Sequence, residues 1–202
     1  SFANLGGDFG IIGSTPADAS SIGRAYGAEF LFQQKLFKGW YGVVAYTIYW
    51  SESQDKKGNY VPTAWDSRHI ISLTGGKKFN KNWEIGLRWG VQGGSPYTTY
   101  DLVASAEPSN WDTNERGVKD YSLLNTERTK WVHQLNVRVD KKWFFEKWSL
   151  NLYLDLQNAY NFKADAPPQV NVERDVNDVP VLNSNGTYNP YQFDNKVDSI
   201  VP

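Results

Sequence analysis

The chain has 202 residues and a formal net charge of −1, from 21 basic and 22 acidic side chains. It contains no cysteine, which excludes a disulfide framework and any thiolate metal site, and its two histidines leave little for an imidazole cluster. The charges are dispersed, so no basic stripe predicts a nucleic-acid partner. Aromatic residues reach 15%, which is more than a core of this size needs.

The chain has neither methionine nor an export signal, so we expect it to be a processed or excised piece of a longer protein. Its longest nearly apolar run, residues 40–50, has 11 residues, against the roughly 20 that a transmembrane helix requires. The sequence therefore predicts no membrane-spanning helix.

Six segments alternate apolar and polar residues with the period of two that a β-strand imposes. In the first segment Ala28 and Phe30 flank Glu29, and the second and third segments alternate less cleanly. The fourth is strict, and the sixth is longer than the fourth because its alternation runs on to Asn158 and Tyr160. The six predicted strands are residues 23–36, 40–51, 69–79, 83–92, 131–143 and 148–160.

The connections between these strands are of two kinds. Short ones, at residues 38–39, 80–82 and 145–147, suit antiparallel hairpins. Long ones, at residues 52–66, 93–129 and after 161, hold most of the prolines together with many Asn, Asp, Ser and Gly residues. This composition predicts irregular, solvated loops.

Each predicted strand has one apolar face, yet no helix or second set of strands remains in the sequence to cover it. Transmembrane barrels solve this by turning apolar residues toward lipid, with short turns on one side and long loops on the other. Aromatic residues also gather beside both kinds of connection, as two membrane interfaces would select. The sequence therefore predicts an all-β fold, an antiparallel meander forming six strands of a transmembrane β-barrel.

Two short motifs carry a resemblance to a known family. Residues 23–30 (GRAYGAEF) open a strand after a loop, and residues 156–161 (LQNAYN) close one. In this order, with hairpins between them, they resemble the C-terminal barrel of TonB-dependent outer-membrane receptors, especially the glycan-importing, SusC-like branch. The resemblance implies residence in the cell outer membrane and import of a bulky nutrient such as a glycan.

The same resemblance implies the partners and the limits of the chain. The partners are outer-membrane lipid, a plug domain of the same full-length chain, TonB bound through a missing N-terminal segment, and a surface lipoprotein in some members. Because such barrels have about 22 strands and end in an aromatic strand, we expect a fragment. Residues 1–22 would be an external loop, residues 23–160 a six-strand barrel segment, and residues 161–202 a long loop before a missing final strand.

Two other readings stay open. A passive outer-membrane porin would have the same kind of wall without a plug. A soluble carbohydrate-binding β-sandwich would instead use the aromatic residues beside the short turns to close the end of its core. The residues do not determine which nutrient is imported.

No catalytic group of residues stands out, so we expect no enzyme activity and no cofactor. His69 and His133 fall on the apolar side of their strands, which suits interfacial rings better than a catalytic base. Residues 175–186 offer oxygen ligands but lack the spacing of a calcium loop, so no metal is predicted.

Substrate recognition is expected in the long loops, where aromatic side chains could stack on sugar rings or fold the loop onto itself. The polar faces of the strands mix both charges and are expected to form a cross-strand ladder that docks the plug. The candidate substrate-binding residues are Tyr97, Tyr100, Trp111 and Tyr121.

Overall fold

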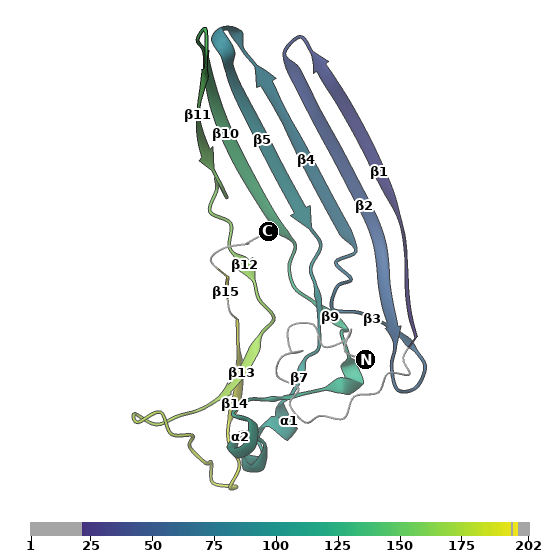
Figure 1. Cartoon of the computed structure of the whole chain (residues 1–202). Helices are drawn as coiled ribbons and strands as arrows, with labels where there is room; N and C mark the ends of the chain where they lie inside the picture. Colours follow the sequence, from purple (N-terminus) through teal and green to yellow (C-terminus); the bar gives the residue numbers. More distant parts are fainter. Residues whose placement is uncertain (1–21, 195, 198–202) are drawn as a thin grey trace.

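A single antiparallel sheet dominates the structure (Figure 1), a computed structural model that describes residues 22–194, 196 and 197. Six long strands follow one another in chain order, and each pairs with the next. They are β1 (Gly23–Phe37), β2 (Trp40–Gln54), β4 (His69–Lys78), β5 (Trp83–Gln92), β10 (Val132–Phe144) and β11 (Ser149–Leu156). The predicted all-β class and antiparallel meander are confirmed.

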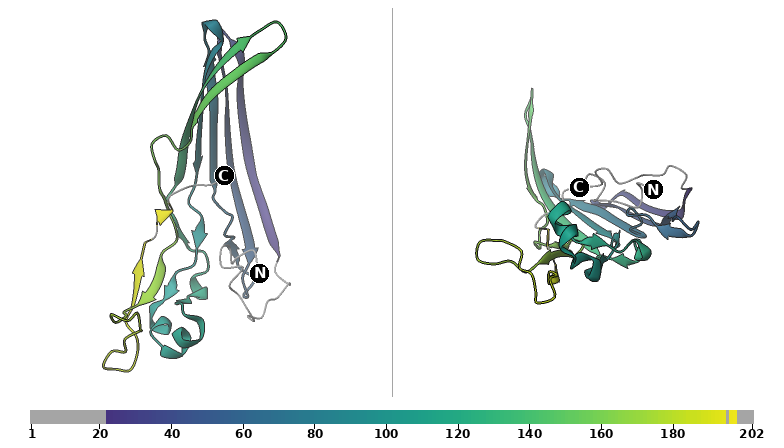
Figure 2. Two further views of the ribbon diagram at one scale, coloured as in Figure 1. Left: turned by 60° about the vertical axis from the view of Figure 1, so that its left-hand side comes forward. Right: turned by 90° about the horizontal axis from the view of Figure 1, so that it is seen from below.

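The described sheet is open, because β1 and β11 form its two edges and do not pair with each other. Figure 2 shows that the hairpin β10–β11 turns away from the plane of the other strands, so the sheet is curved. Nearly all of the predicted external loop 1–22, and the last residues of the predicted loop 161–202, lie outside the described residues.

Two predicted strand ends differ from the structure by three residues or more. The second segment is predicted to end at Ser51, but β2 runs on to Gln54. The alternation that ends the sixth segment predicts a strand running to Tyr160, but β11 ends at Leu156. Asn158 has a φ of 48°, in the left-handed region that strands do not use. Its side chain also accepts a hydrogen bond from the backbone N–H of Phe162 at 2.8 Å, which bends the chain into a turn.

The register keeps one set of side chains on the same side of all six strands. Leu73 of β4 lies opposite Val44 of β2 and Trp89 of β5, and Trp89 in turn lies opposite Leu135 of β10. A bulge after Gln34 adds one residue to β1. Because side chains alternate with a period of two, this extra residue brings Phe37 to the side occupied by its partner Trp40. We call this side the apolar face and the other the polar face.

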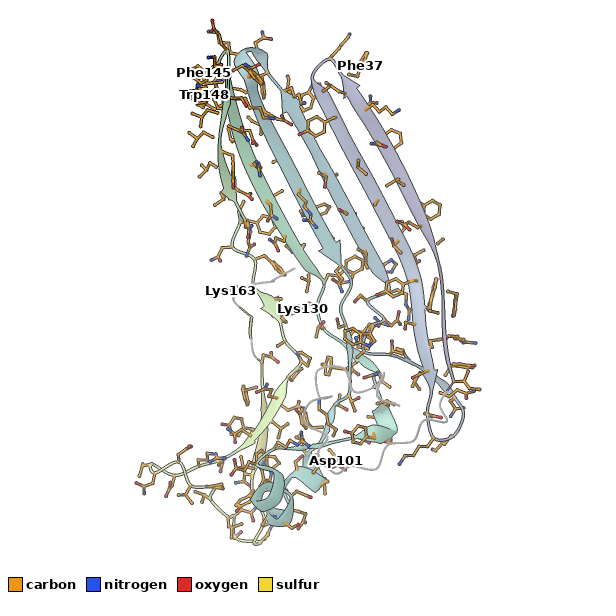
Figure 3. All side chains as sticks on the ribbon, viewed as in Figure 1. Phe37, Asp101, Lys130, Phe145, Trp148 and Lys163 are labelled. Carbon is orange, nitrogen blue, oxygen red and sulfur yellow. The ribbon has the colours of Figure 1, made fainter. Side chains whose placement is uncertain are left out.

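The three predicted short connections close hairpins at one end of the sheet, the turn end (Figure 1). Lys38 and Gly39 both have positive φ, as the commonest two-residue hairpin turn requires. The β4–β5 connection is a short 3-10 turn, η3 (Asn80–Asn82). In the β10–β11 connection the rings of Phe145 and Trp148 stack at 4.0 Å. Figure 3 shows both of these residues, with Phe37, at this end.

The long connections lie at the opposite end, the loop end, and are more ordered than predicted. We call segments 93–131 and 161–197 the loop layer. Both segments contain short strands, and the first also contains the helices. The first long connection, in contrast, contains one short strand that pairs with β2. These elements are too short to produce a recognisable periodic pattern in the sequence. They are β3 (Tyr60–Pro62), β6 (Pro96–Tyr97), β7 (Tyr100–Asp101), α1 (Leu102–Ser105), α2 (Pro108–Asn114), β8 (Val118–Lys119), η4 (Tyr121–Leu123), β9 (Glu127–Arg128), β12 (Ala164–Asp165), β13 (Gln169–Val172), β14 (Pro190–Phe193) and β15 (Lys196–Val197).

Three tight loops beyond the long strands repeat one geometry. They are residues 55–59, 175–179 and 183–187, and in each the first side chain accepts hydrogen bonds from the third and fifth backbone N–H groups. The fourth residue has positive φ in every case. The Asp and Asn oxygens that resembled calcium ligands at 175 and 183 are therefore engaged by the backbone itself.

These loops predict a local response to acid. The backbone N–H of Asn59 holds the pKa of Asp55 below its ordinary 3.8, and the N–H groups of Val179 and Asn177 do the same for Asp175. Because the folded-state pKa is lowered, the contribution to stability is present above pH 3.8 and is lost as the pH falls through that lower pKa. In NMR spectra, the amide signals of Asn59 and Val179 should shift with midpoints below pH 3.8.

The third loop is the internal control, since Asn183 has the same geometry but cannot be protonated. The amide of Thr187 should therefore stay unchanged over the same range. A midpoint at or above the ordinary Asp value for the other two loops would contradict the prediction.

Candidate functional site

The apolar face is uncovered throughout the described chain. The buried hydrophobic residues of the described part all lie in the loop layer, and none belongs to the six long strands. By contrast, Leu152 and Leu154 are 64% and 73% exposed at the centre of β11. Other large side chains exposed on this face are Phe30, Phe32, Trp40, Val44, Leu73, Trp83, Ile85, Leu87, Trp89, Trp143, Leu150 and Leu156.

Such a surface far exceeds the scattered apolar residues that a protein normally shows to water. A sheet with one continuous apolar face is stable only when that face is removed from water, by protein or by lipid. The described chain supplies no such cover, so the partner of this face must come from elsewhere.

Aromatic rings cross the apolar face near the loop end as a continuous row. Phe30 stacks on Tyr46 with ring centroids 6.2 Å apart, Tyr46 on His69 at 6.1 Å, and His69 on Trp131 at 5.3 Å. The Nδ1 atom of His69 lies 2.9 Å from the Tyr46 hydroxyl. His69 is thus one ring among others, as its position in the sequence predicts.

His133 has a similar environment at the end of β10. Its ring lies 3.9 Å from that of Phe162, and its Nδ1 atom is 2.6 Å from the hydroxyl of Tyr160. Among the described residues, each histidine is hydrogen-bonded to a tyrosine hydroxyl, and neither is paired with a nucleophile and an acid as a catalytic site would require.

A second aromatic group occupies the turn end of the same face. Trp40, Phe79, Trp83 and Trp143 lie there, and two lysines are packed among them. We call these rings the turn belt, and the row from Phe30 to Trp131 the loop belt. Between the two belts most side chains of the face are aliphatic, and Phe32 and Trp89 are the aromatic exceptions.

The polar face holds charged groups of both signs, and opposite charges face each other across strands at Arg138 and Asp155 and at Lys78 and Glu84. Arg138 donates two hydrogen bonds to Asp140 of its own strand, at 2.8 and 2.9 Å, and lies over the ring of Tyr153. The predicted ladder of opposite charges between strands is interrupted, because Glu84 lies directly opposite Asp140. The repulsion is offset by the Arg138 guanidinium and by the Tyr41 hydroxyl, which donates to Glu84 at 2.5 Å.

Tyr41 reaches Glu84 by lying flat across Gly76 of the intervening strand β4. A Cβ atom at Gly76 would come within 2.5 Å of the Tyr41 hydroxyl, so glycine is required for this contact. Nearby, a cavity of about 230 Å³ opens at the turn end, with both carboxylates and two lysines in its lining. The turn end of the polar face therefore has an open hollow lined by charged groups of both signs.

A buried ion cluster joins the loops to the end of the sheet. The Asp66 side chain is fully buried, and its Oδ2 atom accepts hydrogen bonds from Arg68 at 3.0 Å and from Arg128 at 2.7 Å. Its Oδ1 atom has no hydrogen-bond partner among the described residues, so these two guanidinium groups alone compensate the charge. Arg128 also donates to the carbonyls of Asp66 and Gly94, which fastens segment 93–131 to the first long connection.

Nothing in the sequence singled out this cluster, because Asp66 and Arg128 are separated by 62 residues in regions that read as loop. Asn125 reinforces the same junction by donating to the carbonyl of Pro62 at 2.8 Å. The long connections are thus held at the rim of the sheet by polar groups, where the apolar core of the loop layer does not reach.

Removing the charge of Asp66 should loosen this junction. The variant Asp66→Asn leaves two guanidinium groups without a counter-ion; because they are about a third exposed, we expect a loss of about 2 kcal/mol in the free energy of opening segment 93–131. Hydrogen exchange of that segment measures the loss. The control is Asp178→Asn, since Asp178 is 87% exposed and 3.8 Å from its partner Arg174, and should change stability by less than about 0.5 kcal/mol. Equal effects of the two substitutions would contradict the role of the cluster.

The four predicted substrate-binding residues have different environments. Trp111 is 4% exposed and packs with Val170, Val172 and Tyr188 in the core of the loop layer. Its indole N–H donates to the carbonyl of Ser105. In this conformation its ring faces are not open to a sugar, and its role is to fold the loops together.

Tyr100 packs against the same core, with Lys119 4.5 Å from the centre of its ring. Tyr97 is half-buried in β6; burial, aided by the charges of Glu127 and Asp194, raises the pKa of its hydroxyl. Tyr121 alone among the four is largely exposed, at 59%. The structure therefore brings Tyr100 and Trp111 together around one core. Of the four residues, Tyr121 has the ring most accessible to a ligand in solution.

This difference predicts two distinct phenotypes. Trp111→Ala should destabilise the loop layer by about 3–5 kcal/mol through the cavity it leaves, and limited proteolysis should cut segments 93–131 and 161–197 faster. Tyr121→Ala should leave the proteolysis rate unchanged, because it removes an exposed side chain. Rapid cleavage of the Tyr121 variant, or an unchanged Trp111 variant, would contradict these assignments.

Among the residues that the structure describes, no group of three or more His, Asp or Glu side chains is placed to hold a metal ion. None of the helices found there has the length and apolar character needed to cross a membrane.

No family model, curated protein or solved structure matches the chain.

Proposed function

We propose that this chain forms part of the β-barrel wall of a TonB-dependent outer-membrane receptor that imports a bulky nutrient such as a glycan. The observation that carries the proposal is the two-faced meander, whose apolar face is uncovered while its polar face carries charged groups of both signs. In this reading, hydrocarbon tails cover the apolar face and the polar face lines the lumen.

The spacing of the two belts supports a membrane of ordinary thickness. His69 of the loop belt and Phe79 of the turn belt lie ten residues apart, at the two ends of β4. This separation is roughly 33 Å along a strand and, at a strand tilt of about 40°, roughly 25 Å along a barrel axis. About 25 Å is the height of the apolar band of outer-membrane barrels, whose edges carry aromatic girdles.

The polar face and the loops have separate tasks in the proposed import. The charges around Arg138, Asp140 and Glu84 would contact a plug domain of the same protein, because that surface offers both signs within a small area. The loop layer would face the outside and capture the ligand together with the plug. The resemblance to the family adds TonB as the source of energy and a surface lipoprotein as a possible partner.

A passive porin would share this wall, and the polar face does not distinguish the two. A plug domain encoded in the same reading frame would support the receptor, whereas its absence there would favour the porin. A soluble sandwich needs a second layer over the apolar face, and the described residues provide none.

A charge on either face tests the orientation. Leu73→Arg places a guanidinium on the apolar face midway between His69 and Lys77 on β4, and should cost about 2–4 kcal/mol in membrane assembly. Ser72→Arg is the matched control, because Ser72 is the adjacent residue on the polar face, opposite Ala45 and Gly90. Assembly into vesicles, followed by protection from added protease, should fall for the first variant and persist for the second. Equal assembly of both variants, or stable folding of the unmodified chain in water without detergent, would overturn the proposed membrane location.

A further inference from the structure

The apolar face carries one ion pair, Arg24–Glu52, beyond the loop belt, and two lysines near the turn end. Lys77 of β4 lies opposite Trp40 of β2 and Ile85 of β5. Lys141 of β10 lies opposite Trp83 of β5 and Leu152 of β11. In the alternation of the sequence both occupy positions that are otherwise apolar, and both are half-buried among their neighbours.

The ammonium groups of these lysines are held against the rings of the turn belt. The Lys77 Nζ atom lies 4.6 Å from the ring centre of Trp40 and 5.1 Å from that of Phe79. The Lys141 Nζ atom lies 5.3 Å from Trp83 and 5.4 Å from Trp143. Each cation is therefore kept on the apolar face, at the level where the aliphatic surface ends.

Neither ammonium group has a carboxylate partner among the residues that the structure describes. Lys141 donates one hydrogen bond, to the carbonyl of Lys81 in η3. Cation–π contacts are made to the faces of rings and leave N–H donors of an ammonium group available to an anion. Two positive charges without counter-ions thus border a surface that suits hydrocarbon.

We propose that Lys77 and Lys141 bind the phosphate of anionic glycerophospholipids in the leaflet at the turn end. This inference rests on the proposed function, because it requires the apolar face to contact a bilayer. Acyl chains would run along the Leu, Ile and Val residues between the belts, while the lysine stems extend toward the headgroups. A negative phosphate at that level supplies the charge that the protein itself does not.

The arrangement favours a lipid over a free phosphate ion. Phosphate in solution would meet two ammonium groups on strands separated by β5, about 10 Å apart across the sheet, and no closed pocket. A phospholipid gains affinity from both parts, since its tails bury apolar surface and its headgroup meets the charge. The two lysines would therefore act on separate headgroups in one leaflet.

Tryptophan quenching by brominated lipids tests this inference, because Trp40, Trp83 and Trp143 lie beside the two ammonium groups. The full chain is reconstituted into vesicles containing dibrominated phosphatidylcholine or dibrominated phosphatidylglycerol. The unmodified chain should be quenched by both lipids, with phosphatidylglycerol binding roughly threefold more strongly. The variant K77Q/K141Q should lose this preference and keep quenching by phosphatidylcholine.

The matched control is K78Q/K142Q, which removes the same charge from the neighbouring residues on the polar face. Its lipid preference should equal that of the unmodified chain. Adding free inorganic phosphate should not reduce the preference, and a complete loss on that addition would assign the lysines to a soluble anion instead.

The outcomes separate the two proposals. Absence of quenching by phosphatidylcholine would show that the belts do not meet a bilayer, and both proposals would fail. Strong quenching without a preference for phosphatidylglycerol, or a preference that K77Q/K141Q retains, would overturn the lipid site alone. Equal loss in K78Q/K142Q would attribute the preference to net charge and also overturn the site.

Discussion

The structure depends on one constraint, which is that apolar surface must be kept from water. Every long strand contributes one apolar row, and the register aligns these rows into a single face. In a globular domain a second layer would cover this face, but the described chain places its own core elsewhere, around Val172 in the loop layer. The strands are therefore held together by backbone pairing, and their shared face requires a cover that the described residues do not supply.

The loop layer follows a different physical principle from the sheet. It has its own small apolar core, with Trp111 at its centre, and its connection to the rim relies on polar groups around Asp66. A buried carboxylate with two guanidinium partners is sensitive to geometry, so it holds the loops in a defined position above the strands. A surface built in this way can present Tyr121 outward without depending on that residue for folding.

The two ends of the apolar face also differ chemically. The loop belt consists of stacked rings alone, including His69, whereas the turn belt includes two lysines among its rings. The asymmetry matches a bilayer whose two interfaces are not equivalent. A lysine at an apolar position such as Lys77 loses hydration, which is unfavourable unless other groups stabilise its charge. An aromatic ring and an anion can both do so.

The amino-acid sequence by itself determined the meander, the three short turns and, except after the bulge in β1, the face on which each strand residue lies. A period of two is a local property, so it can be recognised in the residues of each strand alone. Only the tertiary structure decided that Trp111 is a core residue, that Asp66 meets Arg128, and that Glu84 faces Asp140 across the strands. These contacts join segments far apart in the chain, and elements of two to four residues are too short to carry a recognisable pattern. The end of β11 belongs with them, since a turn fixed by the Asn158 side chain overrode an alternation that continued beyond it.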